Sequence, residues 1–223
     1  MPVIVIASPK GGAGKSTTAI LLATELALAG AKTVLFDCDP NRSVSIWASR
    51  QALPKNIEFI NDVGESDIIR TIKKHDTDGK IAIVDLEGVA SRLVSRAISQ
   101  ADLVITPMRG TTLDATIGAR ALALVAEEEE ALGRNIRHAV VFTMTRAIRS
   151  NQHKGIELSL KEQGVDVIDP PLMERAAYSA LFEYGGNLRT LPPQGNMDGA
   201  ITNAVEFTRG VYQRLAEPVE AAA

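Results

Sequence analysis

Residues 8–19, SPKGGAGKSTTA, form the segment that decides the expected fold. An apolar, β-branched run at 2–8 leads into this segment and predicts a buried strand, and a helical stretch at 16–29 follows it. Its glycines have no Cβ atoms, so the backbone N–H groups can converge on phosphate oxygens at the helix N-terminus. The motif predicts that Lys15 pairs with the β- and γ-phosphates and that the Ser16 hydroxyl ligates Mg²⁺. The predicted phosphate contacts are Gly11, Gly12, Ala13, Gly14, Lys15, Ser16 and Thr17. The simpler alternative is a glycine-rich strand-to-helix turn without a ligand.

The rest of the chain repeats this alternation of strand and helix. Near-continuous apolar runs are typical of strands that are covered on both faces, and they occur at 32–37, 80–85, 101–107, 138–143 and 165–169. Helical stretches lie between or after them at 65–75, 91–99, 112–132, 152–163 and 198–216. The pattern predicts an α/β fold with a doubly wound, mostly parallel sheet and helices on both faces. Ligands in such sheets bind at the carboxyl ends of the strands.

Composition sets limits on the class of protein. The chain has 223 residues with 45% hydrophobic content, and we expect a single domain over 1–217 followed by a frayed tail at 218–223. Its net charge of −3 provides no strong overall attraction for nucleic acid, so any such affinity requires a local patch. One cysteine, Cys38, excludes an intramolecular disulfide, and the N-terminus has no leader-like segment. We therefore expect a cytoplasmic protein.

A second lysine, Lys10, stands at the start of the glycine-rich loop. The segment KGGAGKST resembles the deviant phosphate loop of the ParA/MinD family of ATPases. Three further segments are similar to that family: LFDCDPN to its first switch, IVDLEG to its Mg²⁺-associated strand, and DPPLMERAAYSALFEYGGNL to its base-binding and closing segment. The resemblance implies ATP and Mg²⁺ as cofactors, and a Lys10 that reaches the nucleotide of a partner subunit in an ATP-bound homodimer. The alternative for Lys10 is an exposed lysine before a turn.

The resemblance also implies roles for two aspartates. Asp39 orients the attacking water, and Asp85 holds Mg²⁺ through water, while Asp37 ends its strand. Together with Ser16, Asp39 and Asp85 are the expected metal-site residues, and Lys10, Lys15 and Asp39 are the expected catalytic ones. Hydrolysis of a γ-phosphoryl group requires Mg²⁺ and lysines that neutralise the phosphate charge, and a carboxylate near the attacking water. A turn residue or helix N-cap is the other interpretation of Asp39.

Two positions depart from the family pattern. Two places after the Mg²⁺ aspartate, where the family commonly has a proline or small residue, this chain has Glu87 followed by Gly88. The Glu87 carboxylate either approaches the γ-phosphate or points to solvent, and we favour the solvent orientation. Thr145 precedes Arg146 where the family usually has an asparagine that reads adenine. Base contacts are therefore expected from Arg146, Pro170, Pro171 and Leu172.

Five basic and no acidic residues occur between Leu132 and Ile156. Such a cluster could neutralise DNA phosphates without reading sequence, and an ordinary solvated loop is an equally good interpretation. The candidate DNA contacts are Arg134, Arg149 and Lys154, with Arg209 and Arg214 of the last helix as a second set.

The expected function is that of a small plasmid-type ParA. Such a protein dimerises on ATP, binds nonspecific DNA at the nucleoid, and is released when a centromere-binding, ParB-like partner stimulates hydrolysis, so that plasmids or chromosomes segregate. Positioning of a conjugative DNA-transfer complex would use the same residues. A biosynthetic P-loop ligase that activates a small carboxylate, or an adaptor that barely hydrolyses ATP, are alternatives. The C-terminal segment lacks a cationic amphipathic face, so no membrane anchor is expected.

Overall fold

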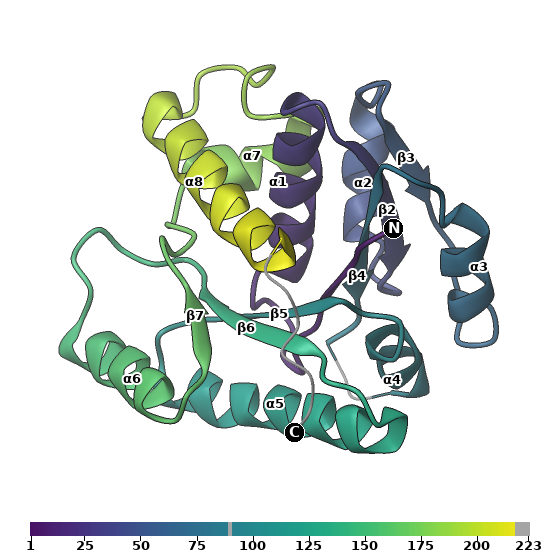
Figure 1. Ribbon diagram of the computed structural model, residues 1–223. Helices are drawn as coiled ribbons and strands as arrows, with labels where there is room; N and C mark the ends of the chain where they lie inside the picture. Colours follow the sequence, from purple (N-terminus) through teal and green to yellow (C-terminus); the bar gives the residue numbers. More distant parts are fainter. Residues whose placement is uncertain (89–90, 217–223) are drawn as a thin grey trace.

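Seven parallel strands form the centre of the protein in the computed structural model, which describes residues 1–88 and 91–216. The strand order is β3-β2-β4-β1-β5-β6-β7 (Figure 1). The strands are β1 (Val3–Ile6), β2 (Lys32–Cys38), β3 (Ile57–Ile60), β4 (Lys80–Leu86), β5 (Leu103–Met108), β6 (Arg137–Phe142) and β7 (Asp166–Ile168). This arrangement confirms the predicted doubly wound parallel sheet. The chain builds β2 to β4 on one side of β1 and β5 to β7 on the other, which places a ligand-binding crevice beside the carboxyl end of β1.

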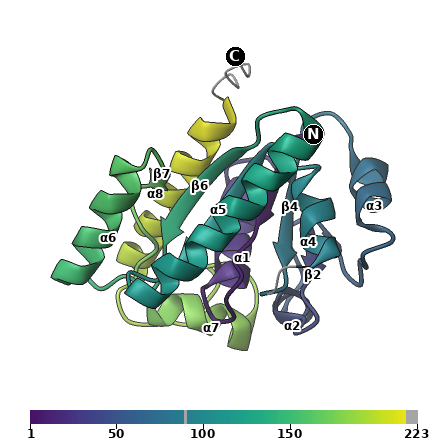
Figure 2. The same ribbon diagram turned by 90° about the horizontal axis from the view of Figure 1, so that it is seen from below.

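Helices cover both faces of the sheet (Figures 1 and 2). One face carries α1 (Lys15–Leu28), α2 (Ser43–Arg50), α7 (Ala176–Tyr184) and α8 (Met197–Ala216). The other carries α3 (Ile68–His75), α4 (Arg92–Ile98), α5 (Thr112–Leu132) and α6 (Asn151–Glu162). The predicted tail at 218–223 lies outside the described residues.

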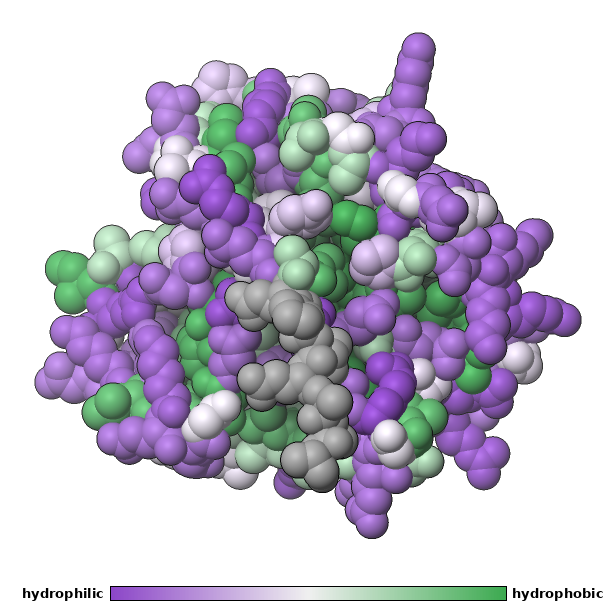
Figure 3. All heavy atoms as spheres, in the orientation of Figure 1, coloured by the Kyte–Doolittle hydropathy of each residue, from purple (hydrophilic) through white to green (hydrophobic). Residues whose placement is uncertain are grey.

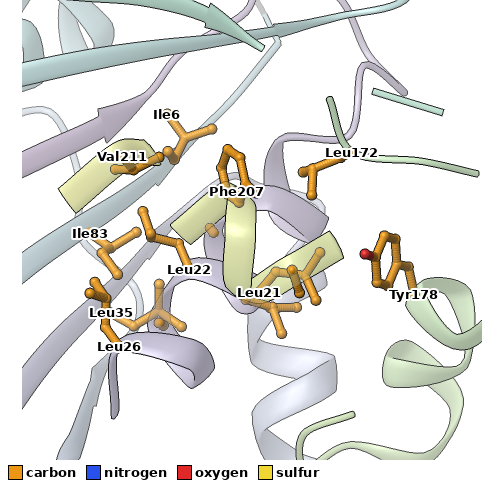
Figure 4. Close-up of a cluster of buried hydrophobic side chains, with 14 of the residues drawn as sticks. Ile6, Leu21, Leu22, Leu26, Leu35, Ile83, Leu172, Tyr178, Phe207 and Val211 are labelled. Atoms are coloured by element: carbon orange, nitrogen blue, oxygen red, sulfur yellow. The ribbon is translucent and has the colours of Figure 1, made fainter. Parts of the chain in front are cut away.

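Helix α1 is enclosed by the sheet and by α8. Leu22 and Leu26 of α1 belong to one buried cluster with Ile83 of the sheet and Phe207 and Val211 of α8 (Figure 4). Because it is buried on nearly every side, the helix is apolar all round, as the run AILLATELALAG indicates. The loop that precedes α1 is thereby fixed to the most buried helix of this layer.

Three elements were absent from the prediction: β3, α2 and α7. The first is a short edge strand that is largely half-buried, and such strands have weak periodicity. Helix α2 has eight residues, half of them polar, and only Val44 and Trp47 are buried in it. These elements depend on tertiary packing, as the bond from the Trp47 indole to the Gly186 carbonyl illustrates (2.9 Å).

Cys38 lies between Asp37 and Asp39 and is buried like a small apolar residue, and burial raises the pKa of its thiol. Among the described helices, none combines the length and apolar character that crossing a membrane requires. The face shown in Figure 3 is mainly hydrophilic, with apolar side chains in small separate areas.

Candidate active site

The glycine-rich loop connects the carboxyl end of β1 to the first turn of α1. Gly12 and Gly14 have φ values of 72° and 90°, which favour glycine. Gly14 is the N-cap of α1 and provides no side-chain cap, so the first N–H groups of the helix remain available to a ligand. The Thr143 hydroxyl donates to the Ala13 carbonyl (2.7 Å), and a Cβ on Gly14 would lie 3.3 Å from the Thr143 side chain. The loop therefore has the local geometry of an anion site at a helix N-terminus.

Lys15 lies inside this loop and is only 6% exposed. Its Nζ donates to the Lys10 carbonyl (3.2 Å). Burial lowers the pKa of the ammonium, and the carboxylates of Asp85, Asp39 and Glu87 oppose that shift. A buried cation beside three carboxylates is suited to a triphosphate that brings its own metal ion.

Asp85 stands at the end of β4 and is fully buried. Burial raises the pKa of its carboxyl to about 7; the Ser16 hydroxyl and the Lys15 ammonium oppose the rise, whereas Asp37 adds to it. Neither oxygen makes a well-aligned hydrogen bond to the described residues, although Ser16 is close enough to lower the pKa. Buried carboxylate oxygens without partners fit a cation with oxygen ligands. The described residues contain no group of three His, Cys, Asp or Glu side chains that could hold a metal alone, so phosphates and water would complete the coordination.

Asp37 and Asp39 differ in how their oxygens are used. Asp37 accepts from the backbone N–H and the hydroxyl of Ser45 (2.7 and 2.6 Å), and these bonds anchor α2. Asp39 accepts from the Asn41 N–H through one oxygen (2.8 Å), as expected of a turn residue. Its other oxygen has no hydrogen bond to the described residues. Asp39 is therefore a turn residue in which one carboxylate oxygen is not hydrogen-bonded to the described residues.

Gly88 has a structural role in the segment after β4, where the sequence departs from the family pattern. A Cβ at this position would lie 3.0 Å from the Gly11 nitrogen and 3.2 Å from Lys15 Nζ. The backbone after β4 thus lies directly against the phosphate loop, and a side chain would separate them. Glu87 is half-buried and close enough to raise the pKa of Lys15, and it shares a depression with Asp37 and Asp39. Its carboxylate is on the phosphate side of the site and only partly in solvent.

Lys10 is engaged within its own chain. Its Nζ contacts Asp114 Oδ1 (2.7 Å), and the Thr111 hydroxyl donates to the other oxygen of the same buried carboxylate. This ion pair is inconsistent with a free surface lysine. Arg109, which the sequence analysis did not single out, donates to the Gly12 carbonyl (2.9 Å) from the end of β5.

A cavity of about 220 Å³ adjoins the phosphate loop between β6 and α7. Of the residues predicted to contact the base, Leu172 lines this cavity, whereas Pro170, Pro171 and Arg146 do not. The Arg146 side chain is 86% exposed. Asn203 fixes the local backbone, because it accepts from the Met173 N–H and donates to the Pro171 carbonyl (2.9 and 2.8 Å). The lining residues that the sequence analysis missed are Thr143, Met144, Met173, Glu174, Arg175, Tyr178, Ser179 and Phe182.

Comparison with known proteins gives the family. The model of the VirC1 protein family matches residues 1–196. A protein named ParA from Rhizobium radiobacter is 61% identical over 219 residues, which are 97% of this chain and 99% of the relative. The chain belongs to the VirC1/ParA family. The resemblance inferred from the phosphate loop is thereby confirmed.

Solved structures share the fold of this VirC1/ParA protein. Apo McdA from Cyanothece has a TM-score of 0.77 at 19% identity, with 97% of this chain and 100% of that chain covered. A plasmid partition protein described as putative, from Borrelia burgdorferi and bound to AMPPNP, has a TM-score of 0.72 at 18% identity, with 96% and 99% covered. At these identities the likeness concerns the fold alone.

The basic stretch of this VirC1/ParA protein is not a free cationic patch. Arg149 pairs with Glu157 (2.6 Å) and lies 3.6 Å from Asp169. Arg134 donates to the carbonyls of Ser99 and Ala101 (2.9 and 3.0 Å). The acidic partners lie outside the stretch in sequence, so a local charge count overestimates the free charge.

In the second set of candidate DNA contacts, one arginine is paired and the other is exposed. Arg214 forms a two-point ion pair with Asp166, whereas Arg209 is exposed on α8. Of the five candidates, Lys154 and Arg209 are the two exposed cations whose side chains make no hydrogen bond or ion pair to the described residues.

Proposed function

We propose that this chain is a partition-type ATPase that binds ATP with Mg²⁺, dimerises on ATP and positions a DNA cargo. The observation that carries the proposal is the convergence of Lys15, Asp85 and Asp39 at the open N-terminus of the buried helix α1. Phosphate oxygens would accept from the loop N–H groups and from Lys15. Ser16 and Asp85 would hold Mg²⁺ together with Asp39, and the ion, when bound, supplies charge neutralisation at the β- and γ-phosphates.

The spare oxygen of Asp39 gives this site its hydrolytic residue. One oxygen is fixed by the Asn41 N–H, which orients the carboxylate so that the second oxygen would accept from a water. The fold alone does not separate an ATPase from a ligase that uses ATP. The family membership and the 61% identity to a ParA over nearly the full length favour partition.

The position of Lys10 supports the proposed dimerisation. Its ammonium lies at the carboxyl edge of the sheet, and near that edge Leu113 is 64% and Ile148 90% exposed. Figure 3 shows apolar atoms protruding where the loop before α6 lies. Exposed apolar side chains beside a cation are suited to a second copy of the chain whose nucleotide accepts Lys10. In that event Lys10 exchanges Asp114 for a phosphate of the partner.

Lys10→Ala tests this assignment. We expect ATP binding by the monomer to stay within a few-fold of the wild type, because Lys15 and the loop N–H groups are unchanged. ATP-induced dimerisation should be lost, because the trans-acting charge is gone. Light scattering with a slowly hydrolysed ATP analogue measures both species, and Lys55→Ala, which removes an exposed lysine on the α2–β3 connection, is the control. A stable Lys10→Ala dimer would contradict the trans role.

The DNA surface is proposed to rest on Lys154 and Arg209, with a centromere-binding, ParB-like protein as the second partner. Two protomers paired by ATP would present twice the number of phosphate contacts, so DNA affinity should require ATP and show little sequence preference. Binding to the nucleoid in the cytoplasm follows from that affinity.

The Lys154→Ala and Arg209→Ala variants test this surface separately. Each removes about one phosphate contact per protomer, so the slope of log K against log salt should fall by roughly two per dimer for whichever residue contacts DNA. Fluorescence anisotropy with a random duplex at several salt concentrations measures the slope. Lys73→Ala on α3 is the matched control. If both slopes equal that of the wild type while ATP still drives dimerisation, DNA binds elsewhere or not at all.

A further inference from the structure

Arg175 is a half-buried cation that the phosphate chemistry does not use. It immediately precedes α7 and lines the 220 Å³ cavity beside the phosphate loop. Its Nε is buried and has no hydrogen-bond partner among the described residues, and none of their carboxylates pairs with its guanidinium. A buried N–H of a charged group that lacks a partner is costly, and in a cavity wall such a group is available to donate to a ligand.

The other polar groups of the cavity have partners or lie in solvent. The Tyr178 hydroxyl is within hydrogen-bond distance of the Ala200 carbonyl and of Asn203 Oδ1 (2.9 and 3.0 Å). The Glu174 carboxylate is 65% exposed and lies 4.0 Å from Arg146. Ser179 is exposed. Among the charged side chains that line this cavity, Arg175 is therefore the one with a buried, unused donor.

The position of the cavity indicates which part of a nucleotide it would hold. Gly14 and Thr17, at the beginning of α1, form one end, where the phosphate chain would leave the loop. Apolar and sulfur-containing side chains form much of the remaining wall: Met144, Leu172, Met173 and Phe182. Such walls suit a flat heteroaromatic ring, and a guanidinium can donate to ring nitrogen or oxygen acceptors or stack on the ring face.

We propose that Arg175 contacts the purine base or ribose of the bound nucleotide and determines base selectivity. The inference rests on the proposed function, because it assumes that the phosphate loop binds a nucleoside triphosphate. It also assigns a side chain to base recognition in a chain where Thr145 replaces the family's asparagine and Arg146 points to solvent. Arg175 is a specificity-determining residue in this account and has no role at the γ-phosphate.

The test compares ATP with inorganic tripolyphosphate, each with Mg²⁺, by isothermal titration calorimetry on the full chain. Arg175→Lys keeps the positive charge and the aliphatic stem but removes the Nε donor. We expect the variant to bind ATP at least about tenfold more weakly, the effect of losing a hydrogen bond that involves a charged group. Its affinity for tripolyphosphate should equal that of the wild type. The ratio of ATP to GTP affinity should also change, which loss of a purely structural contact would not produce.

Arg70→Lys is the matched control, because Arg70 is 82% exposed on α3 and pairs with Asp67, the N-cap residue of the same helix. Thermal unfolding without nucleotide identifies any loss of stability in Arg175→Lys. Equal weakening for both ligands would place Arg175 on the phosphates, and unchanged ATP affinity would make it a structural residue at the start of α7; either result overturns the inference. If the wild type binds neither ligand, the proposed function itself fails, whereas ATP binding that depends on Lys15 but not on Arg175 rejects the inference alone.

Discussion

Lys15→Ala is expected to abolish ATP binding. The ammonium is nearly fully buried and is surrounded by Asp85, Asp39 and Glu87. Without it, a triphosphate would enter a site that contains three carboxylates and no compensating lysine. Removal of one partner from a buried ion pair costs about 3–5 kcal/mol, which corresponds to roughly a hundredfold to several thousandfold in affinity.

Calorimetry with Mg²⁺ and ATP measures this loss directly. Because burial lowers the pKa of Lys15, the substitution also removes a desolvated charge, and the unfolding temperature of the nucleotide-free protein should not fall. Lys55→Ala again serves as the control for a change in net charge. Retention of ATP affinity within a few-fold by a folded Lys15→Ala protein would remove the phosphate-loop assignment.

The phosphate half of the site could be predicted because its signals are local. Lys15 and Ser16 follow the glycines directly, and the aspartates stand at the ends of apolar runs that the parallel sheet brings to one edge. The spacing of the glycine-rich motif and the ends of the apolar runs determine these positions, so no knowledge of the tertiary structure is required. Lys10 is different, because its partner Asp114 is 104 residues away in sequence and no local pattern predicts the pair.

The base half of the site could not be predicted because it depends on packing. Asn203 of α8 fixes the backbone around Met173, and α7 carries several of the lining side chains. The resemblance predicted base contacts from Leu172, which lines the cavity, and from Arg146, whose side chain is exposed, whereas no local pattern indicated that Arg175 also lines the cavity. The ion pair of Arg149 with an acidic residue of the following helix could not be predicted for the same reason.

Asp39→Ala is expected to separate ATP binding from hydrolysis. Ser16 and Asp85 remain to hold Mg²⁺ in this variant, and the main role of Asp39 is on the water, so the ground-state affinity for ATP should change little. Loss of a carboxylate that orients or accepts a proton from the water should lower turnover by about 10²-fold or more. The bond to the Asn41 N–H is also lost, at a cost of about 1 kcal/mol in stability. Release of phosphate under saturating ATP measures turnover, with Asp78→Ala as the exposed aspartate control. Turnover at the wild-type rate would leave Asp39 as a turn residue only.

The central claim is that ATP, and not ADP, joins two copies of this chain through their phosphate-loop faces. The mass of Asp39→Ala by light scattering, in Mg²⁺ with saturating ATP and then with saturating ADP, tests it most directly, because the variant should not consume its ligand. We predict the mass of a dimer with ATP and of a monomer with ADP. The same mass with both nucleotides, when calorimetry shows that both bind, would contradict the account.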